Sequence, residues 1–267
     1  MNLSKAIFKM EARSILAYRF SFWINFFGTT FGQLGLSYFL WRSIYGNDSL
    51  KLIGGMNFEM MILYSFLSSM TLKSVQGMQY LNVNQDIFDG GLNKYIIFPI
   101  SYFHFKWIQQ ITHAMSHVFQ LFIGIIFFAF FIGMPLEYKF KTINFICFLV
   151  NMIIATSLFA AMESIMEMMA FWADNVWSLS VLLRFLINLL SGAWLSLTLF
   201  PRWAQKILDY LPFKGMVYSP VKMLMNDISF SEWYHSQIIM LLWFSFFSLL
   251  AKKIWNLGNL RYTGVGI

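Results

Sequence analysis

The stretch Asp86–Ser101, DIFDGGLNKYIIFPIS, lies between two long apolar segments, and the rest of the chain is organised around it. It carries two acids, two uncharged polar residues and a lysine, turns at Gly90-Gly91 and is interrupted by Pro99. Glycine pairs and prolines end regular structure, so the stretch predicts a short structured loop on a membrane surface. We expect this loop to be presented to another molecule.

The composition is that of an integral membrane protein. Of the 267 residues, 58% are hydrophobic, 20% are aromatic and 12% are charged, and the mean hydropathy is +0.61. Soluble domains have about a quarter of their residues charged. A membrane-crossing helix takes roughly 20 residues, so the chain has room for about six spans and no separate soluble domain. The predicted fold class is therefore all-α, with a single transmembrane domain over residues 1–267.

The chain is expected to begin with an amphipathic helix in residues 1–19 that lies on the membrane. Its basic residues Lys5, Lys9 and Arg13 share one face and apolar residues occupy the other. The same basic residues interrupt any apolar run long enough for a signal peptide. Spans one to three are expected within residues 20–133, spans four and five within 143–200, and span six at 234–254. Their expected bounds are Phe20–Trp41, Met56–Gln76, Trp107–Gly133, Ile143–Met169, Val176–Phe200 and Tyr234–Ile254. The fifth span is expected to be interrupted by Arg184 and by Ser191-Gly192.

Residues 201–233 contain Pro201, Pro212 and Pro220 and cannot form one continuous span, so they predict short helices or re-entrant structure on the outer face. A basic tail in residues 255–267 ends the chain. Cys147 is the only cysteine and lies in an apolar run, so no internal disulfide is expected.

The charge around the first predicted span indicates the orientation. Cytoplasmic flanks of spans carry the excess of lysine and arginine, which places both termini in the cytoplasm. The stretch Asp86–Ser101 then faces the cytoplasm too. The net charge of +7 is assigned to membrane headgroups rather than to nucleic acid. Four cations precede the span and two follow it: Lys5, Lys9, Arg13 and Arg19 against Arg42 and Lys51.

Three local patterns accompany this order of segments. They are Asp86-Ile87 through Gly90-Gly91-Leu92 to Phe98-Pro99-Ile100; Phe200-Pro201 with Leu211-Pro212-Phe213 and Pro220; and Arg261 to Gly266. Together with the order of segments they resemble the membrane subunit of an ABC exporter of the ABC-2 type, in its viologen-exporter-like branch of six-span permeases. The first pattern resembles the coupling segment of that family, except that Phe98 stands where relatives tend to carry a basic residue.

The resemblance implies a permease of the bacterial inner membrane that moves substrate when a separate ATPase subunit hydrolyses ATP. It also implies a second permease subunit, identical or related. The sequence has no G-x-x-x-x-G-K-[ST] phosphate-binding loop, which assigns ATP hydrolysis to another chain. No catalytic residue and no cofactor is expected. The residues implied for the ATPase-coupling loop are Asp86, Asp89, Gly90, Gly91, Leu92 and Pro99.

Five ionisable residues are expected at similar depth inside the membrane: His113, His117, Glu163, Glu167 and Arg184. The histidines and the glutamates are each spaced i, i+4, so each pair shares a helix face. Such groups are costly in a membrane and indicate either pairing or function. We expect a network that holds helices together, with Arg184 neutralising a glutamate, while the lining of a substrate path and a metal site are the alternatives. The same cluster would serve an ion-driven transporter or channel, or a lipid-modifying membrane enzyme.

Overall fold

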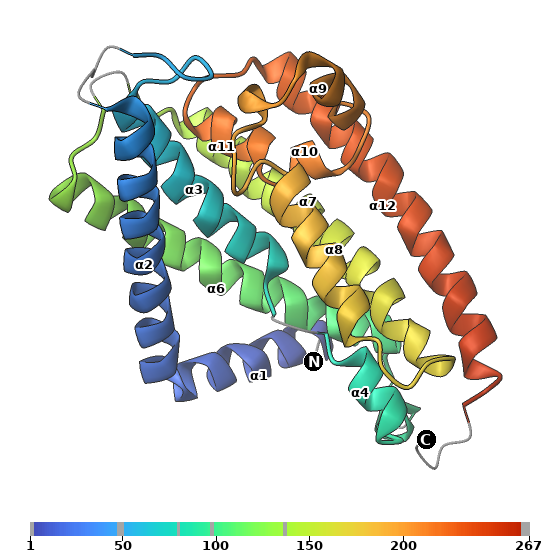
Figure 1. Ribbon diagram of the computed structural model, residues 1–267. Coiled ribbons are helices and arrows are strands. Elements are labelled where there is room, and N and C mark those ends of the chain that lie inside the picture. The colour runs from blue at the N-terminus through green and yellow to red at the C-terminus, as the bar shows by residue number, and fades with distance from the viewer. Residues whose placement is uncertain (1–2, 47–50, 79–80, 97–98, 136–137, 263–267) are drawn as a thin grey trace.

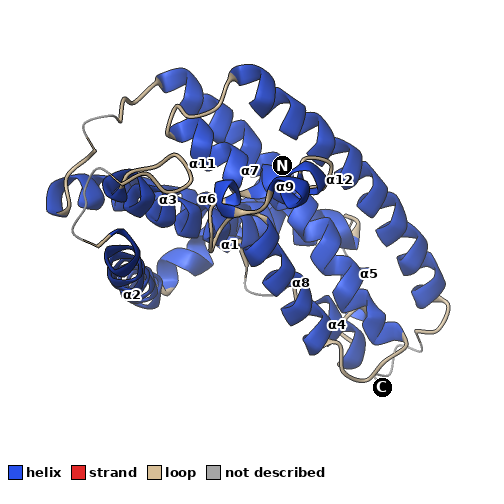
Figure 2. Cartoon of the chain, turned by 45° about the horizontal axis from the view of Figure 1, so that its top comes forward, coloured by secondary structure: helices blue, strands red, loops and turns tan. Residues whose placement is uncertain are grey.

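The computed structural model describes residues 3–46, 51–78, 81–96, 99–135 and 138–262. Over these residues the regular structure is helical, and the single β-type contact is the isolated bridge between Ile53 and Met56 (Figure 2). The all-α fold class is confirmed. The longer helices are α1 (Leu3–Ala17), α2 (Arg19–Tyr45), α3 (Phe58–Gln76), α6 (Tyr102–Phe131), α7 (Thr142–Met168), α8 (Trp177–Leu190) and α12 (Phe230–Asn259).

Helix α7 lies at the centre of the bundle. It contacts α3, α6, α8 and α12, and side chains such as Leu158 and Phe159 are fully buried. An apolar face of a helix can also meet lipid, so the central position of α7 follows from its buried polar side chains, which need partners within the protein: Asn144, Glu163 and Glu167. Helices α2 and α12 lie on opposite sides of this core in both views (Figures 1 and 2).

Three helical stretches of the described chain are long and apolar enough to cross a membrane: Tyr102–Phe131, Thr142–Phe171 and Phe230–Asn259. They contain most of the third, fourth and sixth predicted spans. The first two predicted spans coincide with α2 and α3, which are helical but carry more polar residues. Many exposed side chains are large and apolar, such as Phe130 and Leu249, which suits contact with lipid. The chain is an all-α polytopic membrane protein.

The fifth predicted span, Val176–Phe200, is interrupted at Ser191-Gly192 as predicted, but it is continuous through Arg184 and its α-helix does not resume after the interruption. Helix α8 stops at Leu190 and is followed by a turn in which Gly192 has a φ of +84°. A Cβ atom at this glycine would lie 2.9 Å from the Tyr64 hydroxyl, so both the left-handed backbone and the space require glycine. The helical part is 14 residues or about 21 Å long, well short of a hydrocarbon core of about 30 Å.

Short helices lie at both ends of the bundle (Figure 1). One end holds α4 and α5, and α1 runs across the adjoining end of α2. At the opposite end Pro201 and Pro212 directly precede α9 and α10, and Pro220 lies within α11, so this segment is divided into short helices, as predicted. Both ends of the described chain lie on the α4 side. The short elements are α4 (Val83–Phe88), α5 (Asn93–Ile96), α9 (Arg202–Leu208), α10 (Phe213–Met216), α11 (Tyr218–Leu224) and the 3-10 turns η1 (Met169–Phe171) and η2 (Leu197–Leu199).

Candidate functional site

The predicted loop is a compact helical hairpin made of α4 and α5. Gly90, with a φ of +69°, makes the turn between them, and the Leu92 amide donates to the Asp86 carbonyl at 3.1 Å. Gly91 lies against Asp86, whose Oδ1 would be 3.1 Å from an added Cβ. The glycine pair therefore reverses the chain and lets it pass close to an aspartate. We name residues 83–96 the α4–α5 hairpin.

Asp86 lies inside this hairpin rather than on its surface. Its Oδ1 accepts from Lys94 Nζ at 3.0 Å, and its Oδ2 accepts from the Tyr102 hydroxyl at 2.8 Å and lies 2.7 Å from Lys106 Nζ. Burial alone would raise the pKa of Asp86, but the bonds and charge of Lys106, with Lys94 and Tyr102, outweigh burial and hold the pKa below its usual value. The carboxylate therefore stays charged and joins α4 to α5 and α6.

Glu167 joins the same hairpin to the central helix. Its two carboxylate oxygens accept from the backbone amides of Leu81, at 3.1 Å, and Val83, at 2.6 Å. Amides at the beginning of a helix have no partner within the helix, and an anion placed there satisfies them and favours the helix dipole. Lys106 completes the contact by donating to the Leu81 carbonyl at 2.8 Å. The hairpin is thus hydrogen-bonded to both α6 and α7.

The predicted coupling residues divide into an inner and an outer set. Leu92 is buried in an apolar cluster with Ile87, and Asp86 is 8% exposed. Asp89 and Pro99 are exposed and available to another molecule. Phe98, where the expected basic residue is missing, lies outside the described residues, as do the last residues of the C-terminal pattern.

Glu163 and Arg184 form a direct ion pair between α7 and α8. Arg184 Nη2 lies 2.9 Å from Glu163 Oε1, and the guanidinium also lies over the Phe159 ring, 5.2 Å from its centroid. The Glu163 side chain is fully buried and that of Arg184 is 14% exposed. This is the pairing that the sequence suggested for Arg184.

The two histidines do not reach the glutamates of α7. His113 Nε2 lies 3.6 Å from Glu11 Oε2 on α1. The ring nitrogens of His117 lie 2.8 Å from Gln120 Oε1 and 3.2 Å from the Gly77 carbonyl oxygen. The five predicted groups therefore form four separate contacts, of which Glu163 and Arg184 share one. Within the described chain, no three His, Cys, Asp or Glu side chains come close enough together to hold a metal ion.

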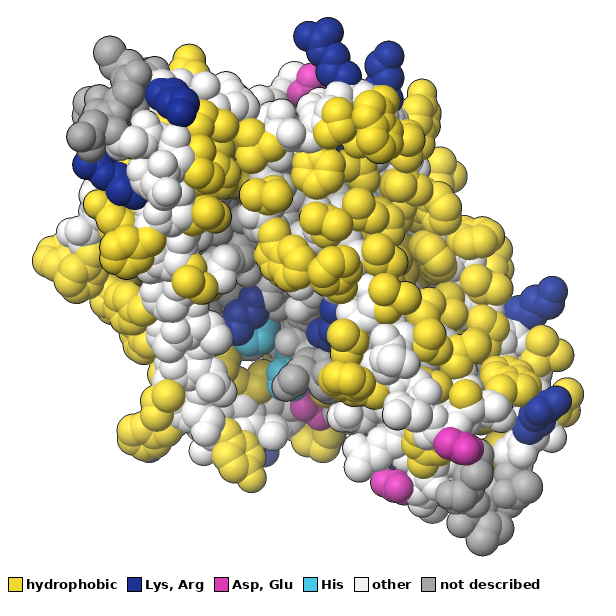
Figure 3. Space-filling model, viewed as in Figure 1, with side chains coloured by type: hydrophobic (Ala, Val, Ile, Leu, Met, Phe, Trp, Pro, Cys, Tyr) yellow, Lys and Arg dark blue, Asp and Glu magenta, His cyan; other side chains and the backbone are white. Residues whose placement is uncertain are grey.

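Between α2, α3, α6 and α8 lies an open cavity of about 660 Å³. Figure 3 shows lysine or arginine and histidine side chains gathered in a hollow on this side of the molecule. The lining residues are Asn25, Lys73, Gln76, Gly77, Met78, Asn82, His113, His117 and Arg184.

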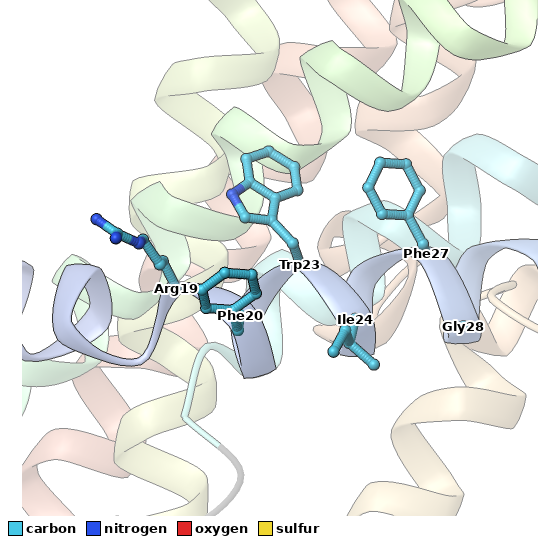
Figure 4. A pocket seen from close by; sticks show the side chains of 6 residues that line it. All are labelled: Arg19, Phe20, Trp23, Ile24, Phe27 and Gly28. Atoms are coloured by element: carbon cyan, nitrogen blue, oxygen red, sulfur yellow. The ribbon is translucent and has the colours of Figure 1, made fainter.

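A second, mostly apolar recess of about 590 Å³ lies along the first part of α2. Figure 4 shows Trp23 and Phe27 on the same side of α2, with Ile24 on the other side and Arg19 at the beginning of the helix. An aromatic and basic surface of this kind suits the boundary between headgroups and hydrocarbon.

Comparison with protein families matches residues 31–266 to the model of the ABC-2 family transporter protein. The match covers the six predicted spans apart from the beginning of the first, and includes the α4–α5 hairpin. The chain belongs to the ABC-2 transporter family. It is therefore a transport protein of the membrane, and the family implies partnership with an ABC ATPase subunit. A comparison with curated proteins found no match. The viologen-exporter-like branch stays a prediction.

The sequence did not indicate the partners that organise the hairpin and the turn at Gly77. Tyr102 and Lys106 are one helical turn apart and both bind Asp86, so their i, i+4 spacing was a usable signal. Gln110 is fully buried and bonds both sides of Gly77, accepting from the Met78 amide at 3.0 Å and donating to the Gln76 carbonyl at 2.7 Å. Nothing local in the sequence marks such a contact.

Proposed function

We propose that this ABC-2 transporter protein is the permease subunit of an exporter and moves its substrate when a separate ATPase subunit hydrolyses ATP. The permease has no phosphate-binding loop of its own in its sequence, so the energy must enter through a surface that another chain can move. The α4–α5 hairpin is that surface. Two permease subunits, identical or related, enclose the path through the inner membrane.

The observation that carries the proposal is the attachment of the hairpin to the bundle. Asp89 is exposed, while Asp86 and the amides of Leu81 and Val83 are bonded to α6 and α7. A push on the exposed side is therefore transmitted through charged hydrogen bonds rather than absorbed by a flexible loop. Since α7 contacts most of the other long helices, its displacement would change the packing of the whole subunit.

The orientation in this proposal is that of the sequence analysis: six spans, both termini in the cytoplasm, and the α4–α5 hairpin on the cytoplasmic side. Its support is that the hairpin and both ends of the described chain lie on one side of the bundle (Figure 1). The alternatives, an ion-driven transporter or a lipid-modifying enzyme, required the histidines and glutamates to act as one site. The described contacts divide them among α1, α3, α4 and α8.

The test is Asp89→Lys, which reverses the charge on the exposed side of the hairpin without touching the Asp86 contacts. Asp209→Lys makes the same charge reversal at the opposite end of the bundle, where the side chain is 43% exposed and pairs with Lys214. We expect Asp89→Lys to reduce both the ATPase subunit that co-purifies with the tagged permease and the substrate exported, while Asp209→Lys changes neither. Equal recovery and equal transport in both variants would remove the hairpin from the mechanism.

A further inference from the structure

The cavity between α2, α3, α6 and α8 is lined by cations and hydrogen-bond donors. Its described lining contains Lys73, Arg184 and two histidines, together with three amide side chains, and no acidic residue. The pocket is open at one side and is large enough for a phosphate-sized group with substituents. This polar and basic lining differs from the neighbouring apolar surfaces and is suited to binding an anionic group.

Two acids next to the cavity lining, Glu163 and Glu11, already have partners within the protein. Glu163 is fully buried behind Arg184, and the Glu11 side chain, 13% exposed, also accepts from Gln109 Nε2 at 2.5 Å. Neither belongs to the lining of the cavity. They hold Arg184 and His113 in place while leaving the donors to face the open space.

Lys73 lacks a carboxylate partner among the described residues. Its ammonium donates to the Thr29 hydroxyl at 3.2 Å, and the residue is half-buried in the last turn of α3. A cation that is partly removed from water is stabilised by an anion, because desolvation of its charge is costly. The protein supplies this lysine with a neutral partner only, so the missing charge is expected from a bound molecule.

An apolar groove adjoins the cavity on the other side of His117. The Phe22 ring stacks on the His117 ring with a centroid distance of 6.3 Å, and Phe22 also lines a groove of about 310 Å³ between α1, α2 and α6. This ring pair therefore lies between the cavity and the groove. The other large apolar side chains of the groove are Phe8, Ile15, Leu16, Trp23, Met115 and Phe119.

We propose that this cavity binds the phosphate group of an anionic amphiphile, whose apolar part lies in the adjoining groove, and that such amphiphiles are the transported substrate class. This rests on the proposed permease function. Lysine and arginine bind phosphate through short, charge-assisted hydrogen bonds, and the asparagine and glutamine amides add neutral donors. The apolar groove binds the remainder by burial of its hydrocarbon surface.

The test uses the purified full-length permease in nanodiscs that contain equal amounts of phosphatidylglycerol and phosphatidylcholine. Native mass spectrometry reports which lipids stay bound. We expect the wild type to retain phosphatidylglycerol preferentially and Lys73→Gln to reduce this preference about tenfold, the effect of losing one charged hydrogen bond. Lys253→Gln removes the same charge from the exposed end of α12 and should keep the preference.

Two further variants keep the result interpretable if Lys73→Gln folds poorly. Lys73→Arg retains the charge and should retain the preference. Asn82→Asp replaces the side-chain amide nitrogen of an exposed lining residue by an oxygen. The resulting carboxylate in the cavity should weaken phosphatidylglycerol binding. Equal preference in the wild type, Lys73→Gln and Asn82→Asp would mean ordinary boundary lipid only and would overturn the proposal.

A second experiment tests whether the site binds the phosphate of a lipid headgroup or that of a free phosphate compound. Glycerol 3-phosphate is titrated into permease in phosphatidylcholine nanodiscs, and the melting temperature is followed. Stabilisation that requires Lys73 would show that the phosphate group is recognised without a tail. No stabilisation, with phosphatidylglycerol still retained, would assign the site to amphiphiles.

Recovery of the ATPase subunit is measured in the same preparations. Lost lipid preference with normal ATPase recovery in Lys73→Gln supports the anion site. Absence of any lipid preference, with the Asp89→Lys effect intact, would remove the anion site and leave the proposed permease function standing.

Discussion

The two ends of the bundle each bury a lysine, but they compensate its charge differently. At the hairpin end, Lys106 is 6% exposed and its partner Asp86 is 8% exposed. At the opposite end, Lys222 is 2% exposed, while the side chain of its partner Asp227 is 48% exposed. One ion pair is therefore wholly internal, and the other connects a buried cation to a solvated anion.

The two lysines also differ in the groups that surround them. Lys106 donates to a carbonyl oxygen in addition to the carboxylate, whereas Lys222 lies over the rings of Tyr64 and Tyr218, at 5.7 and 5.9 Å from the centroids, and near the Met56 sulfur. Aromatic rings stabilise a cation without needing a defined direction, but hydrogen bonds to fixed oxygens do need one. The hairpin end is consequently the more directionally constrained of the two.

The largest effect is expected for Lys106→Met. The substitution takes a charged donor from the internal Asp86 and from the Leu81 carbonyl, and should cost about 3 kcal/mol of stability. Lys222→Met leaves Asp227 half in solvent and should cost about 1 kcal/mol. Melting temperatures of the two purified variants measure the difference.

The double variant Lys106→Met with Asp86→Asn is the control for this comparison. Removing both charges together should recover part of the loss, because the buried carboxylate that Lys106 helped to neutralise is removed as well. If Lys106→Met and Lys222→Met melt at the same temperature, the difference between an internal and a solvated ion pair does not affect the stability of the protein.

A smaller effect is expected for Arg184→Ala, which breaks the third buried charge pair. Glu163 loses its arginine but can take up a proton, which limits the cost to about 2 kcal/mol. We expect lower abundance in the membrane, measured by immunoblot, and partial recovery when Glu163→Gln is added. Wild-type abundance and transport in both Arg184→Gln and Glu163→Gln would show that this pair contributes to neither stability nor transport.

The smallest effect on the fold is expected from single cysteines that establish which end is outside. Lys206→Cys lies at an exposed position of α9, and Lys253→Cys lies at the opposite side of the bundle. With the buried Cys147 changed to serine, an impermeant thiol reagent added to intact cells should label only position 206. Labelling of position 253 instead would place the α4–α5 hairpin outside the cell and contradict the proposed coupling.

Most of the helices were predictable because their signals are local. The apolar runs predicted α6, α7 and α12, the Gly90-Gly91 pair predicted the turn of the hairpin, and Pro201 and Pro212 predicted a broken segment. Ser191-Gly192 predicted an interruption of the fifth span, but the complete end of α8 at this point was not predictable from local signals. It depends on Tyr64, whose hydroxyl donates to the Gly192 carbonyl at 2.6 Å from a distant helix.

The candidate site was predictable in its residues but not in its pairings. Acidic and basic residues within apolar segments could be singled out because a charge in a membrane is energetically costly. Arg184 was correctly expected to pair with a glutamate. Glu167, however, binds two backbone amides, and His113 faces Glu11 of α1. Neither partner could be chosen without knowing how the helices are rotated toward one another.

By itself, the sequence determined that this chain is a helical membrane protein with a structured loop after its second predicted span, because hydropathy, helix length and chain breakers act over a few neighbouring residues. Only the tertiary structure decided that Asp86 points inward, that Glu167 attaches the hairpin to α7, and that Lys73 faces a cavity lined by other donors. Those arrangements bring together residues that lie far apart in the sequence, such as Lys73 and Arg184, and the packing of whole helices sets the distances between them.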